Sequence, residues 1–405
     1  MNMAELVPAQ GQPARPPLIR AMNEQLLISH LRQLGSCSRA DLARLSGLSK
    51  PTVSLALANV ERSGLVRIAG QRTGGPGRSS VLYEIRPDAG YVLGLDIGHE
   101  YLRGAIADLT GEIRAQADTR CASAGAGRRV SELIKLADSI CAAAGVARAD
   151  VTQTVIGTPG IYDRRRDSIV LTGGLVGWDK PSVLSELRAA FGQDLAVEND
   201  TDAAALAERE HGHGRDMASF AFVSIGTGIG MGLVLGGQLH RGVHGVAGEI
   251  AFLPIADGPW SGDGQEARKR GTLEAAGSAA AIVRSARQAG LRASSARHVF
   301  EAAAAGNPRA GAIVTAEARL VAKAVCAIVA VVDPGLVVLG GGIGQAPGFA
   351  LAVAAELKRI SPVVPPIKVS ALGTSAVVDG CLASGAELAW RQLTERVTPA
   401  ADLAP

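Results

Sequence analysis

Residues 219–236 read SFAFVSIGTGIGMGLVLG, an apolar and β-branched run that is interrupted by a cluster of glycines. Such a composition is typical of a buried strand that ends at a tight turn. Similar β-like runs recur along the chain, and Ala-rich stretches of helical length separate them. These runs are YVLGLDIG at 91–98, TVIGTPG at 154–160 and LVVLGGGIG at 336–344. Strands that alternate with helices predict an α/β fold.

The alternating part of the chain begins near Tyr91, after a short linker at residues 87–90. We expect it to form one unit over residues 91–395, with two similarly folded lobes and a cleft between them. Three glycine-bearing segments have the spacing of a nucleotide-and-sugar cleft, and Glu198-Asn199-Asp200 lies between the first two. The segments contain Asp96 and Gly98; Gly226, Thr227 and Gly228; and Gly340, Gly341 and Gly342.

The N-terminal part has a different character. Residues 1–20, rich in Pro, Gln and Ala, are expected to form a disordered lead-in. Residues 21–87 show three short helical patterns, of which the second and third have Ser38 and Ser49 as natural N-caps. Two β-like runs then flank a glycine-rich loop. This order predicts an α+β winged helix-turn-helix.

Charge supports a DNA-binding role for this part. Residues 1–86 hold 11 Lys and Arg against 5 Asp and Glu, whereas the remainder holds 30 against 33. A basic segment favours a polyanion, and short polar side chains at a helix N-terminus can approach phosphates and base edges. A protein-interaction module with a basic face is the alternative. The expected DNA-binding set is Arg39, Ser49, Lys50, Thr52, Val53, Ser54, Arg72 and Arg78.

Composition excludes several other classes. Five cysteines, at widely separated positions, form no CxxC pair and are expected to be reduced thiols. The chain has neither a long uncharged apolar run nor a hydrophobic signal core, which predicts a cytoplasmic protein. Aromatic residues make up 3% of the chain, too few for a groove that stacks single-stranded nucleic acid.

Four stretches are similar to the ROK family (repressors, open reading frames and kinases), over roughly residues 22–390. They read GTPGIYD at 157–163, VENDTDAAALAE at 197–208, SIGTGIGMGLVLGGQLHRGVHGVAGE at 224–249 and VVDPGLVVLGGGIG at 331–344. The resemblance implies a two-lobed actin/hexokinase-like (ribonuclease H-like) fold. It also implies a sugar site in the cleft, and in a kinase the carboxylate of Asp200 would act as the base on the attacking hydroxyl. The implied sugar-binding set is Gly157, Pro159, Gly160, Asn199, Asp200, Glu249 and Glu274.

The chain departs from the family pattern at two places, of which the first argues against a kinase. Where ROK kinases follow the first Asp-Ile-Gly with Gly-Thr-Lys, this chain has His99, Glu100 and Tyr101. An acid at that position repels phosphate. The family's zinc ligands fall on Phe252, Gln265, Ala267 and Thr272, none of which is a usual zinc ligand, so we expect neither metal nor cofactor.

The sequence therefore predicts a zinc-less repressor of carbohydrate genes, in which the nucleotide loops are degenerate and no residue is catalytic. Its expected partners are palindromic double-stranded operator DNA, a sugar or sugar derivative as effector, and a second copy of the chain in a homodimer or homotetramer. An ATP-dependent sugar kinase with an attached DNA-binding domain stays open as the alternative, because Asp96, Asp200 and the second glycine loop are retained.

Overall fold

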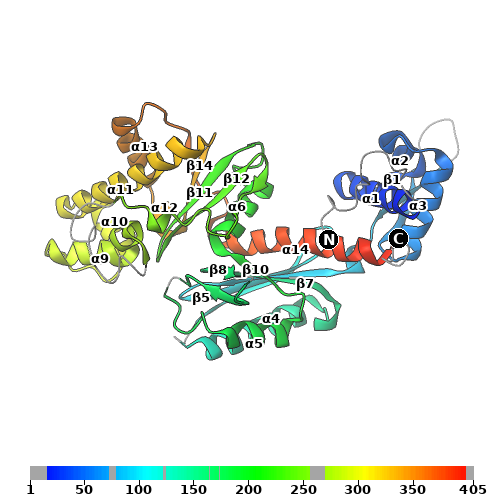
Figure 1. Cartoon of the computed structure of the whole chain (residues 1–405), viewed down its shortest axis with the longest axis horizontal. Coiled ribbons are helices and arrows are strands. Elements are labelled where there is room, and N and C mark those ends of the chain that lie inside the picture. The colour runs from blue at the N-terminus through cyan, green and yellow to red at the C-terminus, as the bar shows by residue number, and fades with distance from the viewer. Residues whose placement is uncertain are drawn as a thin grey trace.

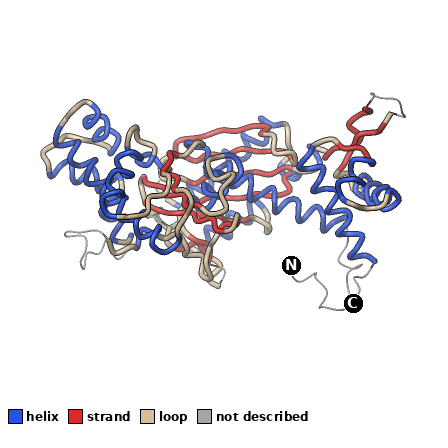
Figure 2. Tube along the Cα trace, turned by 90° about the horizontal axis from the view of Figure 1, so that it is seen from above, coloured by secondary structure: helices blue, strands red, loops and turns tan. Residues whose placement is uncertain are grey.

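The computed structural model describes residues 16–72, 79–121, 125–163, 165–172, 174–255 and 270–397. The chain forms two lobes, each built on a five-stranded sheet, and an N-terminal region that lies apart from both (Figure 1). Helix α14 (Ala376–Val397) runs from between the lobes to the N-terminal region. Seen from above, the molecule is elongated, with the N-terminal helices and strands at one end (Figure 2). The expected α/β fold with two lobes and a winged helix-turn-helix is confirmed.

The N-terminal region consists of three helices and a small sheet of order β1-β3-β2. Ser38 caps α2 and accepts a hydrogen bond from Asp41 N, while the Asp41 carboxylate accepts one from Ser38 N, so both ends of the turn are fixed. Ser49 caps α3 in the same way, by accepting from Thr52 N. The elements are α1 (Pro16–Leu34), β1 (Cys37–Ser38), α2 (Arg39–Ser46), α3 (Lys50–Arg62), β2 (Val66–Arg72) and β3 (Ser80–Ile85).

One expectation about this region is corrected. Helix α1 begins at Pro16, so residues 16–20, which were assigned to the lead-in, are helical. Proline is tolerated in the first turn of a helix, which is where Pro16 and Pro17 lie. The rest of the expected lead-in, residues 1–15, lies outside the described residues.

The first lobe has the strand order β10-β7-β4-β5-β6. Strands β4, β7 and β10 are parallel, and β5 and β6 continue the sheet antiparallel. Helices α4 and α5 cover one face, where Leu133, Ile140 and Leu187 pack against Leu93 and Leu95. The elements are β4 (Tyr91–Ile97), β5 (Tyr101–Asp108), β6 (Ile113–Arg120), α4 (Ala126–Ala144), β7 (Val151–Thr158), β8 (Ile161–Asp163), β9 (Ser168–Val170), α5 (Pro181–Phe191) and β10 (Ala196–Asn199).

The second lobe has the strand order β13-β12-β11-β14-β15. Its helices α8 to α13 bury one face of the sheet in the largest hydrophobic cluster of the described chain, and α6 packs on the other face. The elements are α6 (Asp200–His211), β11 (Phe220–Ile225), β12 (Ile229–Leu235), β13 (Gln238–Leu239), α8 (Thr272–Gly277), α9 (Ala279–Gln288), α10 (Ala296–Ala304), α11 (Pro308–Val332), β14 (Val337–Gly340), α12 (Gly341–Gly344), α13 (Phe349–Ile360) and β15 (Ile367–Val369).

Helices α6 and α14 cross where the two lobes meet. The crossing is so close that a Cβ on Gly380 would lie 1.7 Å from the Ala203 carbonyl oxygen, so only glycine fits there. The far half of α14 buries Trp390 and Leu393 in a hydrophobic cluster that also contains Leu27 and Leu31 of α1. One helix thus contacts both the lobes and the N-terminal region. Within the described residues, no helix has the length and apolar character needed to cross a membrane.

Candidate functional site

A cavity of about 1010 Å³ lies between the two lobes. Most of the residues that the sequence assigned to a cleft line it, although they come from segments far apart in the chain. Those that line it are Asp96, Gly98, Pro159, Gly160, Asn199, Asp200, Gly226, Thr227, Gly228, Glu249, Glu274, Gly341 and Gly342. The structure therefore brings together one end of β4, the start of α6, the β11–β12 turn and the start of α12.

Asn199 is the last residue of β10, and Asp200 is the first residue of α6. Asn199 is the N-cap of α6 and accepts hydrogen bonds from Thr201 N and Asp202 N, while its amide donates to Gly160 O at 3.0 Å. These contacts fix the loop that carries Pro159 and Gly160. Burial raises the pKa of Asp200 to about 6, against the opposing hydrogen bond from Thr201 N.

Glu249 and Glu274 face Asp200 from the second lobe. Burial raises the pKa of Glu249 to about 7, and the nearby carboxylates of Asp200 and Glu274 add to the rise. Glu274 is buried and accepts a hydrogen bond from Ile229 N at 2.9 Å, so it also holds the glycine turn in place. Asp200, at the junction between β10 of the first lobe and α6, therefore converges with two carboxylates of the second lobe on one end of the cavity. Such an arrangement is suited to binding several hydroxyl groups.

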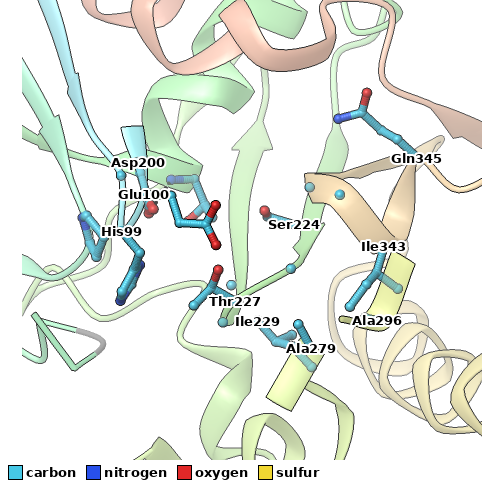
Figure 3. Close-up of a pocket in the computed structure, with 18 of the residues that line it drawn as sticks. His99, Glu100, Asp200, Ser224, Thr227, Ile229, Ala279, Ala296, Ile343 and Gln345 are labelled. Carbon is cyan, nitrogen blue, oxygen red and sulfur yellow. Dashed lines mark hydrogen bonds between the residues drawn. The ribbon is translucent and has the colours of Figure 1, made fainter. Parts of the chain in front are cut away.

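Asp96, at the end of β4, also lines the cavity. It pairs with Arg103 at 3.1 Å, yet burial outweighs that pairing and raises its pKa to about 7. The β4–β5 turn, which follows Asp96 in the chain, lines the cavity too. There the Glu100 side chain reaches into the cavity between Asp200 and Thr227 (Figure 3).

The far end of the cavity is more apolar. Its walls come from α10, from α12 and from the segment after α12; Ala296 and Ile343 lie close together there, and Gln345 lies further along (Figure 3). Phe300 of α10 also lines the cavity. Arg297 also lines this end, where it pairs with Glu301 at 2.8 Å. An apolar wall with few polar groups is the usual composition of a small-molecule site.

Two predicted cleft residues do not line the cavity. A Cβ on Gly157 would lie 2.5 Å from Val377 Cγ1, and one on Gly340 would lie 2.2 Å from the Phe222 ring. These glycines allow a helix and a strand to approach their neighbours closely. They serve packing and lie outside the lining of the cavity.

In the N-terminal region, the structure separates the predicted DNA-binding residues into groups. Lys50 is exposed at the start of α3, with Ser54 partly exposed further along it. The Ser49 and Thr52 hydroxyls bond each other at 2.8 Å. The prediction that Val53 contacts DNA is wrong, because Val53 is 0% exposed and packs in the core of this region.

The predicted arginines also differ in their surroundings. Arg39 stacks over the Tyr83 ring, with 5.2 Å from Cζ to the ring centroid. Arg72 lies at the end of β2 and pairs with Asp41 at 3.1 Å, so part of its charge is compensated. Arg78 lies outside the described residues.

The sequence did not predict the ion pair between Arg241 and Glu198, which joins the two lobes. Arg241 binds the carboxylate of Glu198 through two hydrogen bonds, of 2.6 and 3.0 Å. Beside them Asp202 is buried, and among the described residues its Oδ1 has no hydrogen-bond partner. Burial, and then the nearby Glu198, raises the pKa of Asp202 to about 8. The signal that could have drawn attention to Asp202 is its position two residues after Asp200, in the first turn of α6.

The comparison with known proteins agrees with this geometry. Residues 92–392 match the model of the ROK family. The chain is 27% identical over 237 residues to the xylose repressor of Bacillus subtilis, a match that covers 58% of this chain and 61% of that repressor. The curated repressors that it matches are thus spanned over about three fifths of their length.

Solved structures show the same relationship. The ROK hexokinase of Thermus thermophilus is 30% identical, with a TM-score of 0.63, and the match covers 75% of this chain and 99% of the hexokinase. A ROK family transcriptional regulator, a homologue of the Escherichia coli MLC protein, is 24% identical with a TM-score of 0.74. That match covers 94% of this chain and 99% of the regulator. The chain belongs to the ROK family.

Proposed function

We propose that the protein is a sugar-responsive transcriptional repressor of carbohydrate genes. In this proposal the N-terminal region binds operator DNA and the cavity between the lobes binds the effector. The observation that carries the proposal is the course of α14. Val377 near the start of this helix lines the cavity, and Trp390 near its end is buried against the N-terminal region.

The course of α14 links the cavity to the region that binds DNA. A ligand shifts an equilibrium between two lobe arrangements only if it binds one arrangement more tightly. Asp200 on the first side and Glu249 on the second are placed to contact one ligand at once, so that binding favours a closed cleft. Because α14 packs on α6, which it crosses where the two lobes meet, and also on α1, closure displaces the N-terminal region.

DNA binding is supported by the exposed start of α3 and by the charge of this region. Lys50 is exposed and can reach a phosphate or base, and Ser54 lies one turn further along the same helix. The similarity to the xylose repressor of Bacillus subtilis points in the same direction. A dimer would present two such helices to a palindromic operator.

The experiment begins with selection of duplexes from a random pool by the purified chain, followed by thermal-shift measurements against a panel of sugars. We expect an enriched palindromic sequence whose binding weakens steeply with salt. We also expect at least one sugar to stabilise the protein and to change its affinity for that duplex. If no sequence is enriched, the DNA-binding assignment is wrong.

A sugar kinase is the second candidate, supported by the retained Asp96 and Asp200 and by the similarity to the Thermus thermophilus hexokinase. Asp200, with a pKa of about 6, is poised to accept a proton from a hydroxyl. Against this, Glu100 projects into the same part of the cavity. Sugar-dependent ATP consumption that Asp200→Asn abolishes would establish the kinase instead.

A further inference from the structure

The charged side chains that line the cavity are mostly acidic. Among the described residues, six carboxylates and two arginines line it, and no lysine does. Both arginines are already paired with lining carboxylates, Arg103 with Asp96 and Arg297 with Glu301. The four other lining carboxylates belong to Glu100, Asp200, Glu249 and Glu274. An anionic ligand would therefore find few opposite charges and many like ones.

Glu100 occupies a turn whose backbone is firmly held. Arg129, only 5% exposed, donates hydrogen bonds to Gly98 O at 2.6 Å and to His99 O at 3.4 Å. The Glu100 carbonyl accepts a hydrogen bond from Cys121 N at 2.7 Å. All three backbone carbonyls of the turn accept hydrogen bonds. The backbone that carries the Glu100 side chain is therefore held in place beside the cavity.

The β11–β12 turn lies across the cavity from Glu100. Its Thr227 and Gly228 N–H groups, and the Thr227 hydroxyl, make no hydrogen bond within the described part of the chain. Backbone N–H groups of this kind in a glycine turn attract anions. In Figure 3 the Glu100 carboxylate points toward Thr227. The protein's own carboxylate therefore faces a group of lining donors that could receive an anion from a ligand.

We propose that Glu100 is a specificity-determining residue that excludes anionic groups from the space between Asp200 and the β11–β12 turn, so that the effector is a sugar with neither phosphate nor carboxylate. This inference rests on the proposed function, since it assumes that a sugar occupies the cavity. The raised pKa values of Asp200 and Glu249 agree with it, because a partly buried pocket that already retains protons disfavours further negative charge.

The wild-type protein gives the first test. Isothermal titration compares matched pairs, namely glucose with glucose 6-phosphate, and N-acetylmannosamine with its 6-phosphate, together with xylose, glucuronate and pyrophosphate. We expect any sugar that binds to do so at least about tenfold more tightly than its anionic partner, and pyrophosphate not to bind. Tighter binding of a sugar phosphate than of its parent sugar overturns the inference while leaving the sensor function intact.

Variants give the second test, which does not depend on finding the sugar. Glu100→Gln should gain pyrophosphate binding by about tenfold or more, whereas Glu100→Asp should keep the wild-type exclusion. Glu112→Gln, at an exposed acid on the β5–β6 turn of the same lobe, changes the net charge equally and should gain nothing. Pyrophosphate binding that is equal in Glu100→Gln and in the wild type contradicts the role of Glu100.

The wild-type titrations and the variant titrations together distinguish a failure of the proposed sensor function from a failure of the role assigned to Glu100. If none of the neutral or anionic sugars binds but Glu100→Gln gains pyrophosphate binding, the charge barrier stands and the proposed sensor function is what fails. If a neutral sugar binds and Glu100→Gln leaves the preference over its phosphate unchanged, the sensor function stands and the assignment of Glu100 fails.

Discussion

The guanidinium of Arg32, on α1, lies over the indole ring of Trp390, on α14, with 5.0 Å between Cζ and the ring centroid. The same guanidinium lies 3.6 Å from the Glu387 carboxylate, one turn earlier on α14. Trp390 is buried beneath it. Since α14 begins beside the cavity, this contact is where a movement of the helix would reach the N-terminal region.

Arg32→Gln should uncouple effector from DNA. The amide keeps part of the stem but loses the cation that stacks on Trp390, a contact worth about 0.5–1 kcal/mol. We expect sugar affinity and ligand-free DNA affinity within about twofold of wild type, and a smaller effector-induced change in DNA affinity. Arg319→Gln, which breaks a comparable exposed pair with Glu356 in the second lobe, is the control. An effector response of wild-type size in Arg32→Gln would remove this contact from the account.

Asp200→Asn and Glu249→Gln should weaken effector binding. Each change keeps the shape of the side chain and part of its hydrogen-bonding capacity but removes the charge that strengthens bonds to sugar hydroxyls. We expect at least about tenfold weaker sugar binding by calorimetry. Glu186→Gln, at an exposed position on α5, serves as the matched control. Unchanged sugar affinity in both cavity variants would place the ligand elsewhere.

Asp202→Asn should stabilise the protein at high pH. The folded pKa of Asp202, about 8, lies above its ordinary value, so the contribution of its protonated form to stability is complete below that ordinary value and is lost as the pH rises from there through the folded value. Asparagine cannot ionise, so the Asp202→Asn variant does not lose this stability as the pH rises. In urea unfolding, the stability of the variant relative to wild type should rise by at least about 1 kcal/mol between pH 5 and pH 8. A variant that is less stable than wild type at pH 8 would show that the Asp202 carboxylate has a charged partner.

Lys50→Ala and Val53→Ala should separate DNA contact from folding. Lys50 is exposed, so its removal should weaken DNA binding and lower the salt slope by about one, with no change in unfolding. Val53 is wholly buried, so its truncation should cost about 1–3 kcal/mol of stability in the N-terminal region. Denaturant unfolding and duplex titration of both variants check this. Equal stability of Val53→Ala and wild type would contradict the buried placement.

Local features of the fold could be predicted from the sequence. Ser38 and Ser49 cap helices as expected, because a cap depends on residues three positions away. Asp96, Asp200 and Glu249 meet at one cavity because each stands at the end of a strand or the start of a helix, where α/β folds place their ligands.

Features that depend on packing between distant segments could not be predicted. Gly157 resembles a loop glycine in the sequence, but what surrounds it is Val377, which lies 220 residues further along the chain. Val53, by contrast, recurs with Leu57 and Val60 at helical spacing, a pattern that predicts the core-facing side it occupies. Arg32 and Trp390, at opposite ends of the chain, meet only because α14 returns to α1.

The central claim, that occupancy of the cavity changes DNA affinity, is tested most directly by titrating a selected duplex with the protein, with and without a saturating sugar that stabilises it. Fluorescence anisotropy measures the dissociation constant in each condition, with Asp200→Asn alongside. The account predicts a change of at least about fivefold in the wild type and little change in Asp200→Asn. The same dissociation constant with and without the bound sugar in the wild type would contradict it.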